Sequence, residues 1–234
     1  MMKKPDIKNL LYKTLAGFVL ISFSAYAYAH GIHGPDRAFI ENSVGLAPAA
    51  FMYLGAKHMI TGYDHLLYLI GVIFYLSNFR DIIKLVSLFA LGHSITLLFG
   101  VLANVHVNPY FIDALIGFSV VYKAYENLGG FKRLNISPSI PAAVFIFGLI
   151  HGFGLATKIQ EFTLSQEGIV TNIISFNVGV EIGQICALVI ILIFFKLFQR
   201  SSLFNKSSLY INWLLMVAGF VLVGYQLTGL FLQT

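Results

Sequence analysis

The sequence predicts an all-α membrane protein, and both its composition and its hydrophobic patterning support this fold class. Hydrophobic residues make up 58% of the chain and charged residues only 11%, whereas soluble domains carry about 25% charged residues. Six apolar runs follow one another, each near the ~20 residues that a helix needs to cross a bilayer. We therefore expect a six-transmembrane-helix bundle that forms one domain.

A further hydrophobic segment at the amino terminus has the pattern of a secretory signal peptide. Within residues 1–29, a start with four lysines precedes an apolar core over 15–25, and Ala27-Tyr28-Ala29 matches the small-x-small cleavage pattern. The short run and the well-placed cleavage pattern favour cleavage after Ala29. An uncleaved segment would instead form a seventh span.

Cleavage leaves two parts in the mature chain. Residues 30–50 form a periplasmic segment that contains His30 and His33, and residues 51–234 form the six-helix transmembrane domain. As the new amino terminus, His30 offers an amine and an imidazole, and His33 adds another nitrogen. We expect this segment to capture a metal ion outside the membrane.

The charges of the loops indicate how the spans are oriented. Loops after the first, third and fifth spans carry pairs of basic residues, whereas the 105–108 loop carries none. Because Lys and Arg concentrate in cytoplasmic loops, we expect a multi-pass protein of the bacterial cytoplasmic (inner) membrane with its mature N-terminus outside. The basic residues are Arg80, Lys84, Lys132, Arg133, Arg200 and Lys206. The predicted spans cover about 52–76, 82–104, 109–128, 141–161, 170–196 and 209–232.

The charge distribution, the motifs and the cysteine count of the sequence argue against several kinds of partner and site. The net charge of +5 lies mainly in short loops as a topology signal, so no nucleic-acid partner is expected beside the membrane lipid. The P-loop motif G-x4-G-K-[ST] is absent from the sequence, which argues against a nucleotide partner. Cys186 is the one cysteine, so a metal site in this chain has to use nitrogen and oxygen ligands.

Six ionisable residues lie within or at the ends of the predicted spans. An Asp at the centre of an inserting helix costs about 2.5–3.5 kcal/mol, so such residues usually pair, line an ion path or bind a metal. Nitrogen and oxygen ligands suit Ni²⁺, Co²⁺, Zn²⁺ or Cu²⁺, and the Irving–Williams order does not choose among them. The six residues are His58, Asp64, His65, His93, His151 and Glu181.

Most of these residues are predicted to lie at a similar depth in the membrane. Asp64 and His65 fall about 12–13 residues into the first span, while His93, His151 and Glu181 lie near the middle of theirs. Four antiparallel helices would then build one site in the core of the bundle. We predict a mid-membrane metal site formed by these side chains.

His58 raises a geometric difficulty for a single site. It precedes His65 by seven residues, which places the two rings ~10 Å apart along an unbroken helix. They are then better interpreted as successive stations on a path from outside. A disruption of the helix at Gly62 would remove this objection.

Small residues predict where helices pack closely. G-x-x-x-G motifs at 148–152 and 179–183 surround His151 and Glu181, and such motifs let helix backbones approach each other in lipid. Packing alone would explain these motifs. A sharper interpretation is that they hold His151 close to Glu181.

Other polar residues are expected to have structural roles. The fifth span carries a stripe of polar side chains, which favours either a wet cavity or a helix–helix network. Lys123 and Glu126 are spaced as an interfacial ion pair, and Asp113 is expected near the outer surface, where water would solvate it. The stripe consists of Asn177, Glu181 and Gln184.

Four motifs on four spans occur together in a known family. They are H-x5-D-H at 58–65, G-H-S-I-T at 92–96, F-G-L-I-H-G-F-G-L-A at 147–156 and F-N-V-G-V-E-I-G-Q at 176–184. Over about residues 51–195 the chain strongly resembles the HupE/UreJ family of bacterial membrane proteins, specifically its second branch. The resemblance implies nickel or cobalt uptake, with partners among the maturation factors of hydrogenase or urease. It also maps the family's H-x5-D-H motif onto His58, Asp64 and His65.

Three functions remain open on these residues. The first is a permease, not an enzyme, that moves a divalent transition-metal ion (nickel first, cobalt second) from periplasm to cytoplasm through the His/Asp/Glu site. The alternative is an intramembrane zinc-dependent hydrolase, in which three histidines hold Zn²⁺, a carboxylate acts as base and Ser94 lies beside His93. The third is a metal sensor or assembly partner that does not transport.

Overall fold

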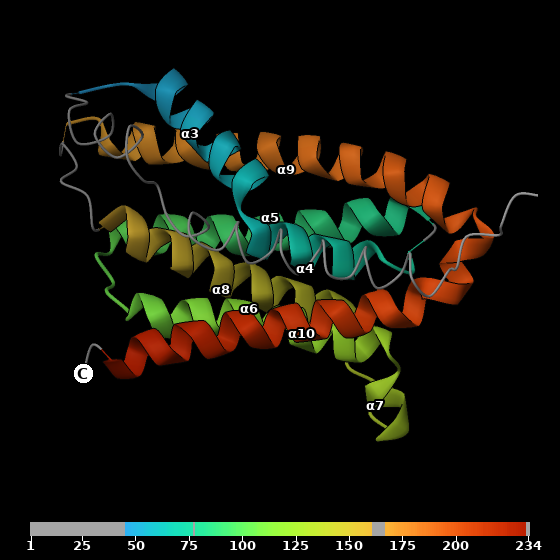
Figure 1. Cartoon of the computed structure of the whole chain (residues 1–234). Coiled ribbons are helices and arrows are strands. Elements are labelled where there is room, and N and C mark those ends of the chain that lie inside the picture. Colours follow the sequence, from blue (N-terminus) through green and yellow to red (C-terminus); the bar gives the residue numbers. More distant parts are fainter. Residues whose placement is uncertain (1–44, 77, 161–166, 233–234) are drawn as a thin grey trace, which may run out of the picture. The chain divides into compact units, whose positions relative to one another are not determined.

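The computed structural model describes residues 45–76, 78–160 and 167–232, which form helices joined by short connections (Figure 1). The described segments contain no β-strand, and the expectation of an all-α membrane protein is confirmed. The predicted signal peptide and both His30 and His33 lie outside the described residues. The helices are α3 (Pro48–Thr61), α4 (Tyr63–Ile73), α5 (Phe79–Leu102), α6 (Pro109–Asn127), α7 (Gly130–Arg133), α8 (Ile140–Gln160), α9 (Ile169–Gln199) and α10 (Ser202–Leu232).

Four of these helices are long and apolar enough to cross a membrane. They are α5, α8, α9 and α10, and they fall in the predicted second, fourth, fifth and sixth spans. The third span corresponds to α6, which carries Asp113, Lys123 and Glu126 and is therefore less apolar. The first predicted span corresponds to α3 and α4 together.

Local sequence signals set the starts of two helices. The side chain of Asn78 accepts a hydrogen bond from the amide of Arg80 (3.1 Å), which caps α5. The side chain of Asn108 accepts from the amide of Tyr110 (2.9 Å), and Pro109 follows at the first helical position. The residues of these short loops therefore determine where α5 and α6 begin.

The first span is not one helix, because the chain breaks at Gly62. A break at this glycine is the possibility that the spacing of His58 and His65 raised. This residue has an extended conformation (φ −74°, ψ 103°) that ends α3 and precedes α4. A Cβ atom at this position would lie only 2.9 Å from Nδ1 of His65 and 3.2 Å from Oδ1 of Asp64. Glycine at this position leaves room for the polar side chains that follow it.

Glycines bring α8 close to α5. A Cβ atom on Gly148 would overlap the carbonyl oxygen of Phe89, and one on Gly152 would overlap that of His93. The first G-x-x-x-G motif is therefore a helix-packing motif, as predicted. It holds the backbone beside His151 against α5.

The second G-x-x-x-G motif joins α9 to α3. A Cβ atom on Gly179 would overlap the carbonyl oxygen of Met52, and one on Gly183 would crowd that of Ala56. The helices pair most extensively as α5 with α8, α3 with α9 and α6 with α10. The expectation that the two motifs hold His151 close to Glu181 is wrong, because each motif packs its helix on a different partner.

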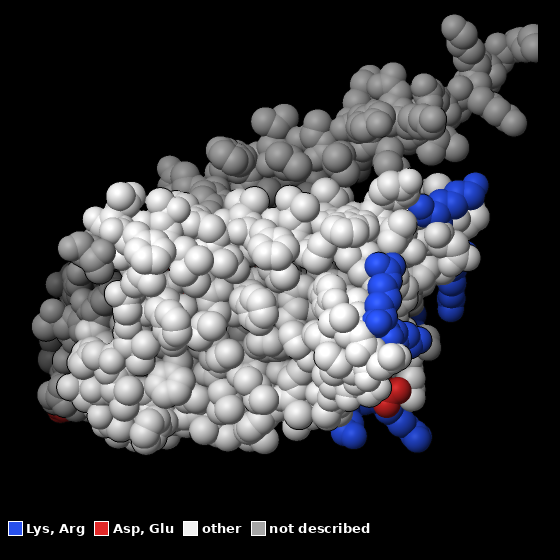
Figure 2. All heavy atoms as spheres, turned by 90° about the horizontal axis from the view of Figure 1, so that it is seen from below, with Lys and Arg blue, Asp and Glu red and all other residues white. Residues whose placement is uncertain are grey.

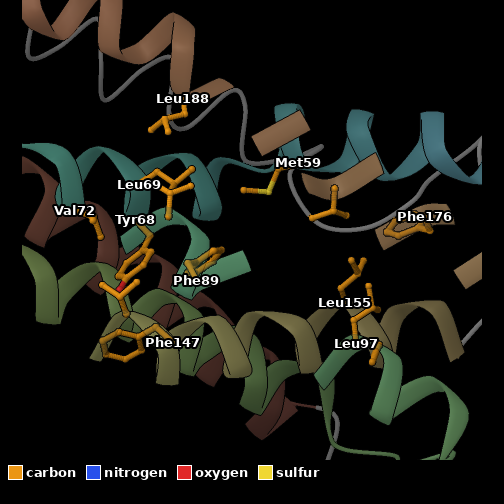
Figure 3. Close-up of a cluster of buried hydrophobic side chains, with 14 of the residues drawn as sticks. Met59, Tyr68, Leu69, Val72, Phe89, Leu97, Phe147, Leu155, Phe176 and Leu188 are labelled. Carbon is orange, nitrogen blue, oxygen red and sulfur yellow. The ribbon is translucent and has the colours of Figure 1, made fainter. Parts of the chain in front are cut away.

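An aromatic core lies between α4, α5 and α8. Figure 3 shows Tyr68 beside Phe89, with Phe147 below it. The ring centroid of Tyr68 is 5.5 Å from that of Phe89 and 5.6 Å from that of Phe147. All three side chains are buried, so they form a dry wall next to whatever the helices enclose.

Many of the Lys and Arg side chains gather at one end of the bundle. Figure 2 shows their side chains together at the end where Figure 1 places α7 and the turn from α9 to α10. We call this the basic end. The loops that follow the first, third and fifth spans meet there. This agrees with the prediction that these loops lie on the same side of the membrane.

Candidate metal centre

Four imidazole rings from four helices gather in the interior. His65 of α4 is central: its ring centroid lies 4.9 Å from that of His151 on α8 and 5.9 Å from that of His93 on α5. His58 of α3 lies 5.3 Å from His65. We call these four residues the histidine cluster. The break at Gly62 explains why His58 and His65 are neighbours and not ~10 Å apart, as they would be on one helix.

Asp64 fixes the orientation of the central ring. Nδ1 of His65 lies 2.9 Å from Oδ1 of Asp64, which also accepts a hydrogen bond from the backbone amide of His65. An ionised carboxylate can only accept, so Nδ1 carries a proton, and in the neutral ring Nε2 presents its lone pair. Both side chains are buried. This is the arrangement that prepares a histidine to bind a metal.

A backbone carbonyl orients His151 in the same way. Its Nδ1 lies 2.7 Å from the carbonyl oxygen of Phe147, one turn earlier on α8. The carbonyl accepts the Nδ1 proton, which again leaves Nε2 with a free lone pair. Two rings on different helices are therefore held in the same tautomer.

Several nitrogens of the histidine cluster lack hydrogen bonds. Within the described part of the chain, no partner reaches Nε2 of His65, Nε2 of His151 or either ring nitrogen of His93, although all of these atoms are buried. A buried polar atom without a partner costs about 1–3 kcal/mol. A single bound ion that accepts a lone pair from each of three rings would offset this cost at several atoms at once.

The rings contact one another mainly edge to face. Their interplanar angles with His65 are 79° for His58, 65° for His93 and 64° for His151. Among the described residues, no group of three or more His, Cys, Asp and Glu side chains is arranged to hold a metal ion as it stands. Because histidine–metal bonds are about 2.0–2.1 Å long, the rings have to turn their nitrogens toward a common point to bind one.

Glu181 lies at the edge of this site. Its side chain is exposed on α9, and Oε1 accepts a hydrogen bond from the hydroxyl of Ser94 at 3.4 Å. Asn177 donates to the same hydroxyl at 2.8 Å. Gln184 donates to the carbonyl of Val86 at 3.2 Å. The predicted stripe on the fifth span is therefore a helix–helix network between α9 and α5.

The aromatic neighbours of the cluster were not predicted from the sequence. The ring of Phe89 lies 5.0 Å from that of His151, and the ring of Tyr68 lies 5.6 Å from it. Tyr68 follows His65 by three residues, so the two side chains share one face of a helix. This spacing could have identified Tyr68 as a neighbour of the cluster. These rings exclude water from one side of the histidine cluster.

Two ion pairs lie on α6, beyond the cluster in either direction. Lys123 pairs with Glu126 at 3.0 Å, as its spacing predicted. Lys158 of α8 pairs with Asp113 at 3.0 Å. The expectation that water solvates Asp113 is wrong, because its side chain is buried against α8.

These features define an integral membrane protein of helices that enclose a cluster of oriented, buried histidines. Residues 35–234 match the family model described as HupE / UreJ protein. The chain belongs to the HupE/UreJ family, whose members are membrane proteins of the nickel/cobalt transporter type. No curated protein and no solved structure matches the chain. The match confirms the resemblance seen in the four motifs and gives no support to a zinc hydrolase.

Proposed function

We propose that the chain is a permease that moves a divalent transition-metal ion from the periplasm to the cytoplasm. Nickel is the first candidate and cobalt the second. The observation that carries the proposal is the set of buried, unpartnered nitrogens on His65, His93 and His151, which come from three different helices. Imidazole nitrogen is a ligand that suits these metals.

Asp64 gives the site the negative charge that a dication needs. Its carboxylate is buried beside His65, so it offsets part of the charge that the ion brings into the bundle. It also holds the Nδ1 proton of His65, so that the neutral ring directs the lone pair of Nε2 to the site, and metal ligands have to be deprotonated. Protonation of the imidazoles would weaken binding and assist release.

The basic end supports the proposed orientation of the permease. By the positive-inside rule this end would face the cytoplasm, and α3 would enter the membrane from the opposite side. His58 lies on α3 and is half-buried, so it would receive the ion first and pass it to His65. Upstream of the described residues, His30 and His33 would capture the ion in the periplasm.

The remaining polar side chains would complete the path. Glu181 is linked through Ser94 to the segment of α5 that carries His93, so its carboxylate would attract the cation toward that side of the cluster. The mature chain contains no P-loop motif, and the membrane potential would supply the drive. An inward divalent cation gains about twice the ~2.3 kcal/mol that one charge gains per 100 mV. Maturation factors of a metalloenzyme would then receive the ion.

Metal accumulation in cells tests this function. Cells that express wild type, His65→Ala, His151→Ala or His106→Ala at matched membrane levels are given trace Ni²⁺, Co²⁺, Zn²⁺ and Cu²⁺, and their metal content is followed by mass spectrometry. His106 lies exposed in the loop before α6 and serves as the control. We expect accumulation of Ni²⁺ or Co²⁺ that both cluster variants abolish and the control retains. Normal accumulation by a correctly inserted His65→Ala variant would overturn the proposal.

A further inference from the structure

An ion pair between a buried lysine and a half-buried glutamate lies between the histidine cluster and the basic end. Nζ of Lys123 is 3.0 Å from Oε2 of Glu126 in the last two turns of α6, and the Lys123 side chain is only 7% exposed. The stem of Lys123 runs along α4, because a Cβ atom on Gly71 would lie 3.1 Å from its Cγ. A lysine near a helix end could extend into water, but this one is turned into the bundle.

Aromatic side chains connect this pair to the histidine cluster. The ring of Tyr68 contacts that of His151, and Tyr68 precedes Gly71 by one turn of α4. Phe147 contacts Tyr68 on one side and Tyr122 on the other, at 5.6 and 5.1 Å between centroids. The rings of Tyr68, Phe147 and Tyr122 therefore link His151 to α6, where Lys123 directly follows Tyr122.

We infer that the Lys123–Glu126 ion pair is the gate through which the metal ion leaves the histidine cluster toward the basic end. This inference rests on the proposed function. An ion that moves from the cluster to the basic end along α4 and α6 has to pass Lys123, whose ammonium would repel it. While Glu126 neutralises that ammonium, the gate carries no net charge.

The chemistry of the two side chains explains how such a gate would operate. An arriving dication competes with Lys123 for the carboxylate of Glu126, and the flexible stem of Lys123 lets its ammonium swing toward the basic end. Carboxylate oxygen suits these metals less well than imidazole nitrogen does. The ion would therefore be held more weakly at Glu126 than in the cluster, which favours release.

The pair can be tested with charge variants and a neighbouring neutral control. Glu126→Gln leaves the ammonium of Lys123 without its counter-charge, and Lys123→Met removes the ammonium. The double variant replaces both charges with neutral groups of similar size, a change that buried pairs often tolerate. Asn127→Ala is the control, because it removes hydrogen bonds to Gly71 and Asn212 at the same end of α6 but changes no charge.

Two readouts are compared for each variant: binding of Ni²⁺ to the purified protein, and the uptake rate into cells per Ni²⁺-binding protein. We expect Glu126→Gln to bind Ni²⁺ like wild type but to transport at least about tenfold more slowly, because like charges repel strongly where water is excluded. Lys123→Met should bind an additional Ni²⁺ ion at the freed carboxylate. The double variant should transport faster than Glu126→Gln, and Asn127→Ala should transport like wild type.

The outcomes separate this inference from the function on which it rests. Uptake by Glu126→Gln at the wild-type rate, in a wild type that does accumulate Ni²⁺, would overturn the gate and leave the permease intact. A slow rate shared by Glu126→Gln, Asn127→Ala and the double variant would also overturn it, because helix packing would then explain the loss. A wild type that binds no metal and accumulates none would overturn the proposed function itself.

Discussion

Asp64 and His65 are adjacent in the chain, and a single carboxylate oxygen of Asp64 accepts from both the ring Nδ1 and the backbone amide of His65, at 2.9 Å each. The extended conformation of Gly62 places both residues in the first turn of α4, where the amides are free of helical partners. His65, which we propose as a metal ligand, and the residue that orients it therefore depend on one break in the backbone.

Replacing Asp64 by Asn should weaken metal binding without unfolding the protein. The amide keeps the shape of the carboxylate but loses its charge and its preference for accepting from Nδ1. Changes to residues that orient a ligand typically cost 10–100-fold in metal affinity. We expect a loss of this order in Ni²⁺ titrations of the purified protein. Asp81→Asn, at the exposed start of α5, is the control, and an equal loss in both variants would contradict the role of Asp64.

Gly62→Ala should disturb the same site from the backbone side. The added Cβ would lie 2.9 Å from Nδ1 of His65, closer than such atoms normally approach. The ring has to move, so we expect weaker Ni²⁺ binding and a loss of about 1–3 kcal/mol in stability, typical of overpacking. Gly224→Ala is the control, because nothing lies within 4 Å of its added Cβ. Wild-type affinity in Gly62→Ala would show that the ring needs no such space.

Gly179→Ala should separate α3 from α9. Its Cβ would overlap the carbonyl oxygen of Met52, and backbone atoms cannot move aside as a flexible side chain can. We expect a lower thermal midpoint in detergent, corresponding to a loss of about 1–3 kcal/mol, while Gly224→Ala stays near wild type. Equal midpoints for the two alanine variants would contradict the packing of α9 on α3.

Lys158→Met should destabilise the protein more than an exposed lysine does. It leaves the buried carboxylate of Asp113 without the ammonium 3.0 Å away, and breaking a buried pair typically costs 3–5 kcal/mol. We expect a clearly lower thermal midpoint than for Lys206→Met, whose side chain is exposed. If the two midpoints agree, the pair between α6 and α8 does not contribute to the fold.

The sequence predicted the helical fold and the meeting of three histidines in the interior because both depend on periodicity and depth. Apolar runs of span length identified α5, α8, α9 and α10, and counting residues from the membrane surface brought His65, His93 and His151 to one level. These inferences need no knowledge of which helices are neighbours. They hold for any compact antiparallel bundle.

What the sequence could not show is which helix packs on which. A G-x-x-x-G motif marks a face but not its partner, so the expectation that the packing of these two motifs holds His151 close to Glu181 was wrong. Lys158 and Asp113 are 45 residues apart, and no local pattern connects them. The side chain of Glu181 is exposed and is linked to the segment that carries His93 through Ser94. Such relationships depend on tertiary packing, that is, on which glycines and which amide side chains meet where two helices contact each other.

The central claim is that the buried histidines bind the transported ion, and X-ray absorption spectroscopy of the Ni²⁺-loaded, purified protein tests it most directly. The account predicts a first shell that contains nitrogen at about 2.1 Å, with the outer-shell scattering typical of imidazole. His65→Ala should lose much of that scattering, while His106→Ala should match wild type. A shell of oxygen alone, or a spectrum that His65→Ala leaves unchanged, would contradict the account.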